Sequence, residues 1–537
     1  MKEVYSAASR VLVWLGPEAD DGHLALDLIR AWAGWGKSAK DVTTEMTEVL
    51  MDTIKKMPEP FEQRSWLAAR RFFARPYWKR TWIFQEIVFA RQIIILCGRN
   101  QLSWDELGRA QIAWVQLSSP RLTTVVNSEA LRLVTLTHYS TVSALAMRHA
   151  LQQDDRRAES IPALISLIST HLAKDPRDKV YALLGFPEVD MLDVSPNYSA
   201  PIEFVYTDFV QRCLEFEGDL RILTLAGIGW HNGDARLNLP TWVSDFRPEG
   251  LGQHPRMQSK HFDAAGTSKG DFEVSDDMKV LRAKGIIFDV ITSITPYYSR
   301  KSAIPGHLLN VALSEKSAYP TGIPRLQAFF RTIIADDFDE KLVRTQPPHT
   351  RGQVEFFDLA AGFLWCLGDY AVRENETNSN RRQLDDQRID HILKMNDYVW
   401  YFGLWSGHFP DSLTKEAMLA PFLGDPDSEY PALQWPEDND LRRGRNCSSE
   451  FMERSIHSCI SRTFFLTEKG YMGLGPRRAK KGDILCVLPG CNVPLLLRRI
   501  DNHYVLVGYG YVLGLMMGEL FKESRSETPE MEEIIIH

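Results

Sequence analysis

The chain has 537 residues, of which 44% are hydrophobic and 25% are charged, and it carries a net charge of -8 with a pI near 6.0. That composition is typical of a globular protein with several domains, and the acidic balance argues against a general nucleic-acid binder, which needs a basic surface. The first residues lack a signal-peptide pattern and no run approaches the roughly 20 apolar residues of a membrane span, so we expect a protein of the cytoplasm or nucleus without such a span.

The amino-terminal part alternates strand and helix patterns. Residues 11–15 form a short β-branched and aromatic run, and residues 92–97 form a second one, with helical patterns between them. Ser103 and Glu106 have the spacing of a capping box for a helix that begins at Trp104. This alternation predicts a piece of an α/β sheet over residues 1–102.

A carboxylate in line with two indoles stands out in this part of the chain. Pro76 suits a first helical position, so a helix from there places Trp78, Trp82 and Glu86 at i, i+4 and i+8 on one face. Such a face can raise the pKa of a glutamate or hold it over a flat substrate. It can equally be core, with Glu86 paired to an arginine at its edge, and the nearby candidates are Arg75, Arg80 and Arg91.

Residues 103–217 are mainly helical in pattern and predict a helical subdomain. Asp175 and Pro176 are placed as N-cap and first residue of one helix, which Gly185 would end. The N-cap position and the helix dipole explain the acids Asp175 and Asp178. They do not explain Arg177, which therefore becomes a candidate contact with a ligand or a partner.

The rest of the chain predicts four further regions. Residues 218–345 mix strands and helices, 346–461 are helical with mobile loops at 375–387 and 422–445, 462–520 form a small antiparallel β unit or partial barrel, and 521–537 are a charged, frayed tail. Gly508, Gly510 and Gly514 resemble a dinucleotide loop but lack the βαβ unit that a Rossmann site needs. We expect these glycines at the turns of a small sheet.

No motif predicts a metal or a cofactor. The seven cysteines are scattered without CxxC spacing, which indicates reduced thiols and no zinc site. His138, His149 and His171 lie in helical patterns without a spaced partner, and P-loop and nucleophile-elbow motifs are absent.

Four blocks of the sequence resemble one fungal family. Residues 13–17 read VWLGP, 75–86 read RPYWKRTWIFQE, and 175–185 read DPRDKVYALLG. Together with the carboxy-terminal block that begins RTFFLTEKGYMGLGP, they are similar to heterokaryon incompatibility (HET) domain proteins. In that family, blocks reading like SYVWG and WIDALCINQ precede the segment seen here as VYSAASRVLVWLGP. This chain begins with MKEVYSAASR, so we expect an amino-terminally truncated relative.

The resemblance implies a multidomain α/β and α+β protein whose residues 1–102 are the distal part of a HET domain, itself similar to TIR domains. In NAD-cleaving TIR-like proteins a glutamate at the matching place contacts the nicotinamide ribose. That role would fall to Glu86, with Trp82 shaping the pocket and Arg80, Gln85 and Arg177 as further contact candidates. A carboxylate suits this cleavage because the departing nicotinamide leaves an oxocarbenium-like ribose. NAD would then be a substrate, and no cofactor is implied.

The family also implies a function in nonself recognition and the cell death linked to it, with protein partners that are copies or relatives of this chain. Two hypotheses follow, an NAD-cleaving effector and a non-enzymatic interaction or regulatory protein that associates with full-length relatives. The missing amino-terminal blocks favour the second, since an open sheet exposes an edge that a partner can cover.

Overall fold

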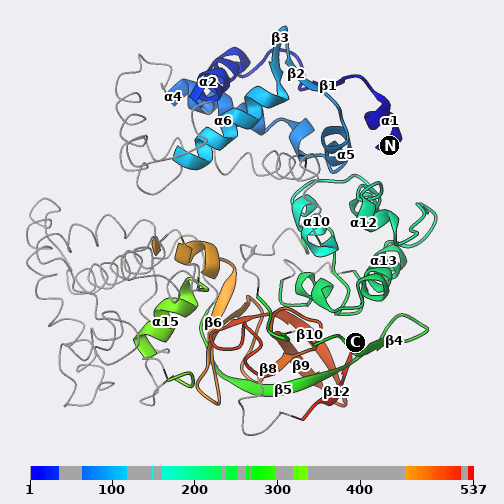
Figure 1. Cartoon of the computed structure of the whole chain (residues 1–537), viewed down its shortest axis with the longest axis vertical. Coiled ribbons are helices and arrows are strands. Elements are labelled where there is room, and N and C mark those ends of the chain that lie inside the picture. Colours follow the sequence, from blue (N-terminus) through cyan, green and yellow to red (C-terminus); the bar gives the residue numbers. More distant parts are fainter. Residues whose placement is uncertain are drawn as a thin grey trace, which may run out of the picture. The chain divides into compact units, whose positions relative to one another are not determined.

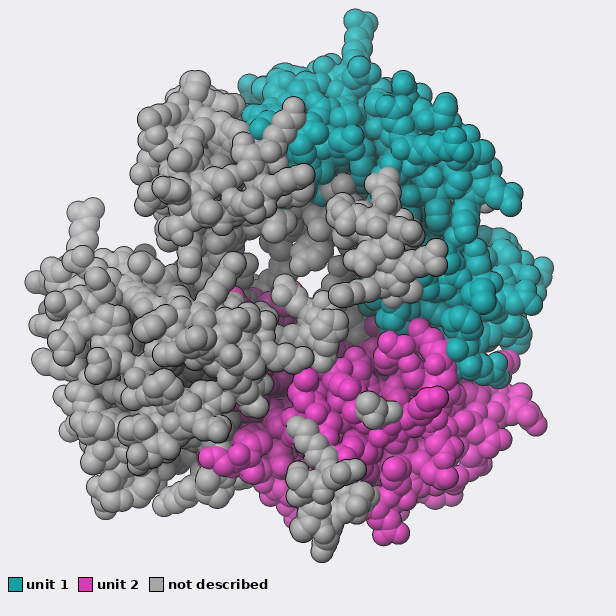
Figure 2. All heavy atoms as spheres, in the orientation of Figure 1, with its two compact units in different colours: residues 1–216, 233–238, 245–252 teal, residues 217–232, 239–244, 253–537 magenta. Residues whose placement is uncertain are grey.

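The computed structural model divides the chain into two compact units (Figures 1 and 2). Unit 1 comprises Met1–Phe216, Gly233–Asn238 and Asp245–Gly252, and unit 2 comprises Glu217–Asn232, Leu239–Ser244 and Gln253–His537. The structure describes residues 2–35, 63–117, 148, 160–230, 237–250, 262–266, 268–296, 319–322, 325–336, 451–452, 454–521 and 530–537. The predicted loops at 375–387 and 422–445, most of the region 346–461, and His138 and His149 lie outside the described residues.

The first part of unit 1 contains a three-stranded sheet and the helices that precede, connect and follow its strands in sequence. Strands β1 (Val11–Trp14) and β2 (Ile93–Cys97) are parallel, and β3 (Asn100–Ser103) is antiparallel to β2. The described residues of the connection between the parallel strands are mainly helical, which is the usual crossover for a parallel pair. The helices of this part are α1 (Lys2–Ala7), α2 (Gly22–Trp35), α4 (Gln63–Phe73), the 3-10 turn η2 (Pro76–Lys79), α5 (Ile83–Val88) and α6 (Trp104–Leu117). The predicted alternation of strand and helix is confirmed.

One face of this sheet builds a core rich in tryptophan. Val11 and Val13 of β1 are buried against it, and Trp32 of α2 meets Trp66 of α4 edge to face at 5.6 Å. The predicted capping box is present, because the Ser103 amide donates to Glu106 (2.8 Å) and the Glu106 amide donates to Ser103 Oγ (3.2 Å). Hydrogen bonds from Ser103 lower the pKa of Glu106.

The single helix predicted from Pro76 to Glu86 is wrong. The chain makes the short η2 turn, runs through an extended Arg80 (φ -77°, ψ 135°) and starts a new helix, α5, whose N-cap is Trp82. The break is set by pairing with a distant segment, since the Leu172 amide donates to Lys79 O and the Thr81 amide donates to Leu172 O. Trp78 therefore does not share a helical face with Glu86.

The second part of unit 1 is helical, as predicted. Its helices are α10 (Ile161–Ile168), α11 (Asp178–Tyr181), α12 (Pro187–Asp190) and α13 (Ile202–Glu217). Helix α11 is shorter than expected and has Arg177 at its N-cap, so the predicted start at Asp175 is wrong. Asp175 instead accepts the Arg177 amide at 3.0 Å in a turn before the helix.

Unit 2 contains a closed β-barrel. The strands in chain order are β4 (Phe272–Val274), β5 (Leu281–Ile294), β6 (Arg462–Thr467), β7 (Met472–Pro476), β8 (Ile484–Val487), β9 (Leu495–Ile500), β10 (His503–Tyr509), β11 (Tyr511–Val512) and β12 (Glu532–Ile536). Pairing runs from β5 through β12, β10, β9 and β8 back to β5, which closes a ring, while β6, β7 and β11 continue from the far end of β5. Helix α15 (Arg325–Ile333) and the 3-10 turn η3 (Arg221–Leu225) also belong to this unit (Figure 1).

Two features of the barrel differ from the predictions. Residues 532–536, expected in a frayed tail, form β12 in the middle of the sheet, and its pairing with β10 is parallel. Gly508 and Gly514 have φ values of 142° and 88° in the segment of β10 and β11, and no helix follows them among the described residues. Gly514 lies in a turn, as predicted, whereas Gly508 lies within strand β10.

Candidate functional site

The carboxylate of Glu86 lies on α5 within a small polar cluster. The hydroxyl of Tyr77 donates to Glu86 Oε2 at 2.9 Å, and Arg80 Nη2 lies 3.5 Å from Oε1. The Glu86 side chain is only 12% exposed, whereas that of Arg80 is 54% exposed. Burial, followed by the charge of Glu86, raises the pKa values of both Tyr77 and Tyr5. Both carboxylate oxygens of Glu86 thus accept hydrogen bonds from side chains of the protein itself.

The two tryptophans of the predicted face have different places. Trp78 is fully buried, its indole donates to Phe72 O at 3.0 Å, and it packs against Phe72 and Phe73. Trp82 is partly exposed and remains four residues before Glu86, whose amide donates to Trp82 O. The structure therefore keeps Trp82 and Glu86 together and removes Trp78 to the core.

Gln85, another candidate contact, does not join this cluster. Its side chain is buried, and its amide donates to Ala182 O (3.1 Å) and Leu184 O (2.5 Å). These bonds tie α5 to the segment after α11. The arrangement gives Gln85 a role in positioning two parts of unit 1.

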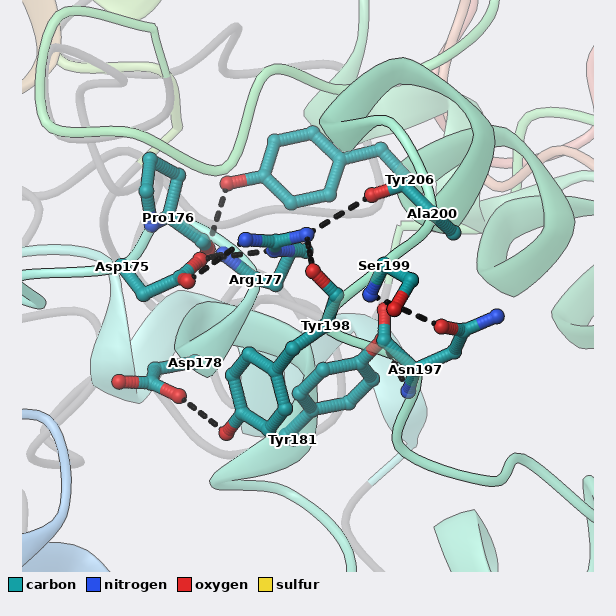
Figure 3. A network of polar contacts seen from close by, with 10 residues as sticks. All are labelled: Asp175, Pro176, Arg177, Asp178, Tyr181, Asn197, Tyr198, Ser199, Ala200 and Tyr206. Carbon is teal, nitrogen blue, oxygen red and sulfur yellow. Dashed lines mark hydrogen bonds and ion pairs between the residues drawn. The ribbon is translucent and has the colours of Figure 1, made fainter.

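Arg177 lies at the centre of a separate network, shown in Figure 3. Its guanidinium forks onto Asp175, with Nε 2.9 Å from Oδ1 and Nη2 2.8 Å from Oδ2. Its Nη1 donates to the backbone oxygens of Tyr198 and Ala200. The Arg177 hydrogen bonds lower the pKa of Asp175. Arg177 thus joins the turn before α11 to the segment that leads into α13.

Three tyrosines complete the network in Figure 3. Tyr206 donates to Pro176 O at 2.8 Å, Tyr181 donates to Asn197 O at 3.0 Å, and Tyr198 donates to Asp178 at 2.7 Å. Burial, followed by the hydrogen bond to Asp178, raises the pKa of Tyr198. The Arg177 guanidinium and the three tyrosine hydroxyls all bond to groups of unit 1 itself, so the network positions chain segments.

Lys179 and Arg75 are buried cations; from the sequence, Lys179 was not considered and Arg75 was named only as a possible partner of Glu86. Lys179 is 2% exposed, and its ammonium donates to the carbonyls of Ile168 (2.9 Å), Ser169 (3.1 Å) and His171 at the end of α10. Arg75, 8% exposed, donates to Leu15, Pro17 and Ala19 in the loop after β1. The repeated charge in the DPRDK block, two cations within three residues, is the signal that could have identified Lys179.

The outer face of the sheet in unit 1 is apolar. Leu12 and Trp14 of β1 are 59% and 53% exposed, and their register partners Ile94 and Leu96 on β2 are half-buried. Within the described part of the chain, β1 pairs with β2 alone and so forms an edge. Four apolar side chains thus share one face beside a sheet edge, which we call the β1 face.

The described residues contain no group of three or more His, Cys, Asp or Glu that could hold a metal ion. The described cysteines Cys97, Cys213, Cys459, Cys486 and Cys491 are buried and form no disulfide with one another. None of the described helices has the length and hydrophobicity to cross a membrane.

Comparisons with known proteins find two family matches and one curated relative. Residues 1–86 match the family described as heterokaryon incompatibility protein (HET), and residues 440–529 match the Het-6 β-barrel domain. The chain is 24% identical over 597 residues to heterokaryon incompatibility protein 6, OR allele, of Neurospora crassa, covering 100% of this chain and 79% of that protein. No solved structure matches.

Proposed function

This chain is a member of the heterokaryon incompatibility (HET) family, and from that premise we propose that it acts in nonself recognition by contacting protein partners and that Glu86 stabilises its fold. The observation that carries the proposal is the state of the Glu86 carboxylate, which is 12% exposed and directed at Tyr77 and Arg80. A catalytic carboxylate must reach a substrate atom.

The carboxyl ends of β1 and β2 support the same conclusion. Ligands of parallel α/β sheets bind beyond the carboxyl ends of the strands. Here Arg75 fills that place, bonding the carbonyls of Leu15, Pro17 and Ala19 in the loop after β1. The guanidinium stabilises the loop, and because its donors bond these carbonyls, they do not bind a phosphate or a ribose.

The β1 face supports a binding role. An exposed apolar patch next to an open strand edge is a typical site of protein contact. Trp14 is the residue type that most often dominates the binding energy of an interface. We therefore assign partner contact to Leu12, Trp14, Ile94 and Leu96.

The first test replaces Glu86 by Gln. We expect Glu86→Gln to leave cell viability and NAD content, measured on expression in a fungal host, the same as with the unchanged chain. The Tyr77 hydroxyl can still donate to the amide oxygen, and loss of the half-exposed ion pair costs at most about 1 kcal/mol.

Arg80→Gln is the matched control, since it removes the same ion pair from the other side and keeps the carboxylate. Viability and NAD content that stay unchanged in both variants support a structural Glu86. If Glu86→Gln restores NAD and viability while the protein stays folded, whether or not Arg80→Gln does the same, Glu86 is catalytic and the proposal is wrong.

The second test addresses the β1 face. Trp14→Lys should weaken capture of a HET-family partner by roughly 2 kcal/mol or more, about 30-fold in affinity, because it removes a large apolar contact. Pull-down from cells that co-express full-length HET-family proteins measures the effect. Met191→Lys, at a residue 68% exposed on another part of unit 1, is the control. Equal capture by both variants would rule out the β1 face.

The second candidate function, cleavage of NAD by a TIR-like site, is favoured by one observation. Trp82 and Glu86 remain at i and i+4, and Trp82 is partly exposed beside the carboxylate. In this alternative the Tyr77 and Arg80 contacts orient Glu86 toward a nicotinamide ribose. Measuring NAD loss with Glu86→Gln and Arg80→Gln, as above, separates the two functions.

A further inference from the structure

Strand β12 fills a slot between β5 and β10 in the barrel of unit 2 (Figure 1). Residues 532–536 pair with residues 281–285 of β5 in antiparallel register, and Ile536 pairs with Tyr504 of β10. Ile534 and Ile536 are completely buried, whereas Glu532 and Glu533 are exposed. The slot thus holds an extended segment in which every second isoleucine is buried and the glutamates are exposed to solvent.

The walls of this slot are supported without β12. Strand β5 also pairs with β4, β8 and β6, and β10 also pairs with β9. Gly285 leaves space for Leu488 and Ile534, since a Cβ there would lie 2.3 Å from Leu488 Cδ2 and 3.0 Å from Ile534 Cδ1. The site is therefore shaped for a branched side chain by elements that hold each other in place.

Thr241 closes the far end of the slot. Its amide donates to His537 O at 2.9 Å, and its hydroxyl accepts the Leu506 amide of β10 at 2.8 Å. The His537 amide donates to Tyr504 O at 2.9 Å. Both polar groups of the incoming main chain at His537 are thus matched, as in domains that bind a peptide by adding it to a sheet.

We propose that the slot is a strand-acceptor site that takes β12 from a second copy of this chain, so that two copies associate by exchanging this strand. The occupant is defined by the molecule itself, because an exchanged β12 makes the same pairings and buries the same isoleucines as its own. Exchange of an identical element is a low-cost route to dimers. Residues 522–529 separate β12 from the preceding part of the barrel and span at most roughly 26 to 29 Å when extended.

Cysteine pairs across the slot test this directly in the full chain. Lys284 and Glu533 are exposed register partners on β5 and β12. A chain with Lys284→Cys and a chain with Glu533→Cys, carrying different tags, are co-expressed and purified through both tags. Exchange predicts a disulfide-linked pair with twice the 61.4 kDa mass of one chain, which separates on reduction.

The control pairs Glu533→Cys with Asp276→Cys, an exposed position outside the slot. A chain with both Lys284→Cys and Glu533→Cys shows that the pair can cross-link at all. If that chain cross-links within itself while the mixed copies give no linked pair, or no more than the Asp276→Cys control, strand exchange is overturned. A free peptide of residues 530–537 should abolish the mixed cross-link, and the same peptide with Ile534→Lys and Ile536→Lys should not.

Discussion

At the level of single residues, buried cations of unit 1 stabilise main-chain carbonyls at places where the chain turns. Arg75 does so for the loop after β1, and Lys179 does so for the end of α10. Carbonyls at the end of a helix have no partner within it and need one from elsewhere. Arg75 and Lys179, which lie in two of the blocks that resemble the HET family, therefore have a structural explanation.

Lys179→Met should strongly destabilise unit 1. The substitution keeps most of the side-chain volume but leaves three carbonyls at the end of α10 without their donor, at a cost of about 3 kcal/mol. Faster hydrogen exchange of the amides in α10 and α11 would measure the loss. Lys174→Met, at an exposed position, should change stability by less than about 0.5 kcal/mol.

The same residue predicts a pH dependence. Burial lowers the pKa of Lys179 to about 7, below the value of about 10.4 for an unfolded lysine. Between these two values the unfolded chain holds more protons, so the unfolding free energy should rise with pH. Thermal melts from pH 7 to 9 should show this rise in the unchanged chain relative to Lys179→Met. Parallel pH profiles of the two proteins would contradict the shifted pKa.

At the level of elements, local signals predicted structure well where the partners are close in sequence. The capping box of Ser103 and Glu106 is one case. Another signal, an aspartate two residues before an arginine, was overlooked as a repeated pattern. In each case the arginine amide and side chain donate to the aspartate, and the pairs are Asp175 with Arg177, Asp219 with Arg221, and Asp245 with Arg247.

Prediction failed where a distant partner decided the conformation. The periodicity of Trp78, Trp82 and Glu86 is that of a helix, yet the pairing of Leu172 with the segment around Arg80 extends the chain between them. The site consequently changes from two indoles and a carboxylate to Trp82, Tyr77 and Arg80 around Glu86. Tyr77 was not a candidate because its contact with Glu86 depends on the η2 turn.

At the level of the whole molecule, the barrel is assembled from segments far apart in the chain. Residues 462–520 supply most of its strands, as the turn spacing predicted, but β5 comes from residues 281–294 and β12 from residues 532–536. Hydrophobic periodicity identifies strands without identifying their neighbours. The charges of residues 522–533 suggested a frayed tail, whereas the isoleucines that follow them place residues 532–536 in a strand.

A substitution at Asp483 tests whether the stability of the closed ring depends on a single buried charge. Its side chain is 1% exposed and accepts Arg498 Nε (2.8 Å), Arg498 Nη2 (2.9 Å) and the Lys480 amide (2.7 Å), joining the turn before β8 to β9. Asp483→Asn leaves the guanidinium without its counter-charge, which costs roughly 3 kcal/mol for a buried pair. Amides of β8 and β9 should then exchange hydrogen about 100-fold faster.

Asp501→Asn is the matched control, because Asp501 is exposed in a turn with φ of 50°. Asparagine tolerates that left-handed conformation as well as aspartate does, so stability should change by less than about 0.5 kcal/mol. Equal exchange rates in the two variants would mean that the Asp483–Arg498 pair adds nothing to the barrel. In that case hydrophobic burial and the strand ladders alone would hold the ring closed. A loss confined to Asp483→Asn would instead show that closure depends on this pair, since β8 joins β5 on one side and β9 on the other.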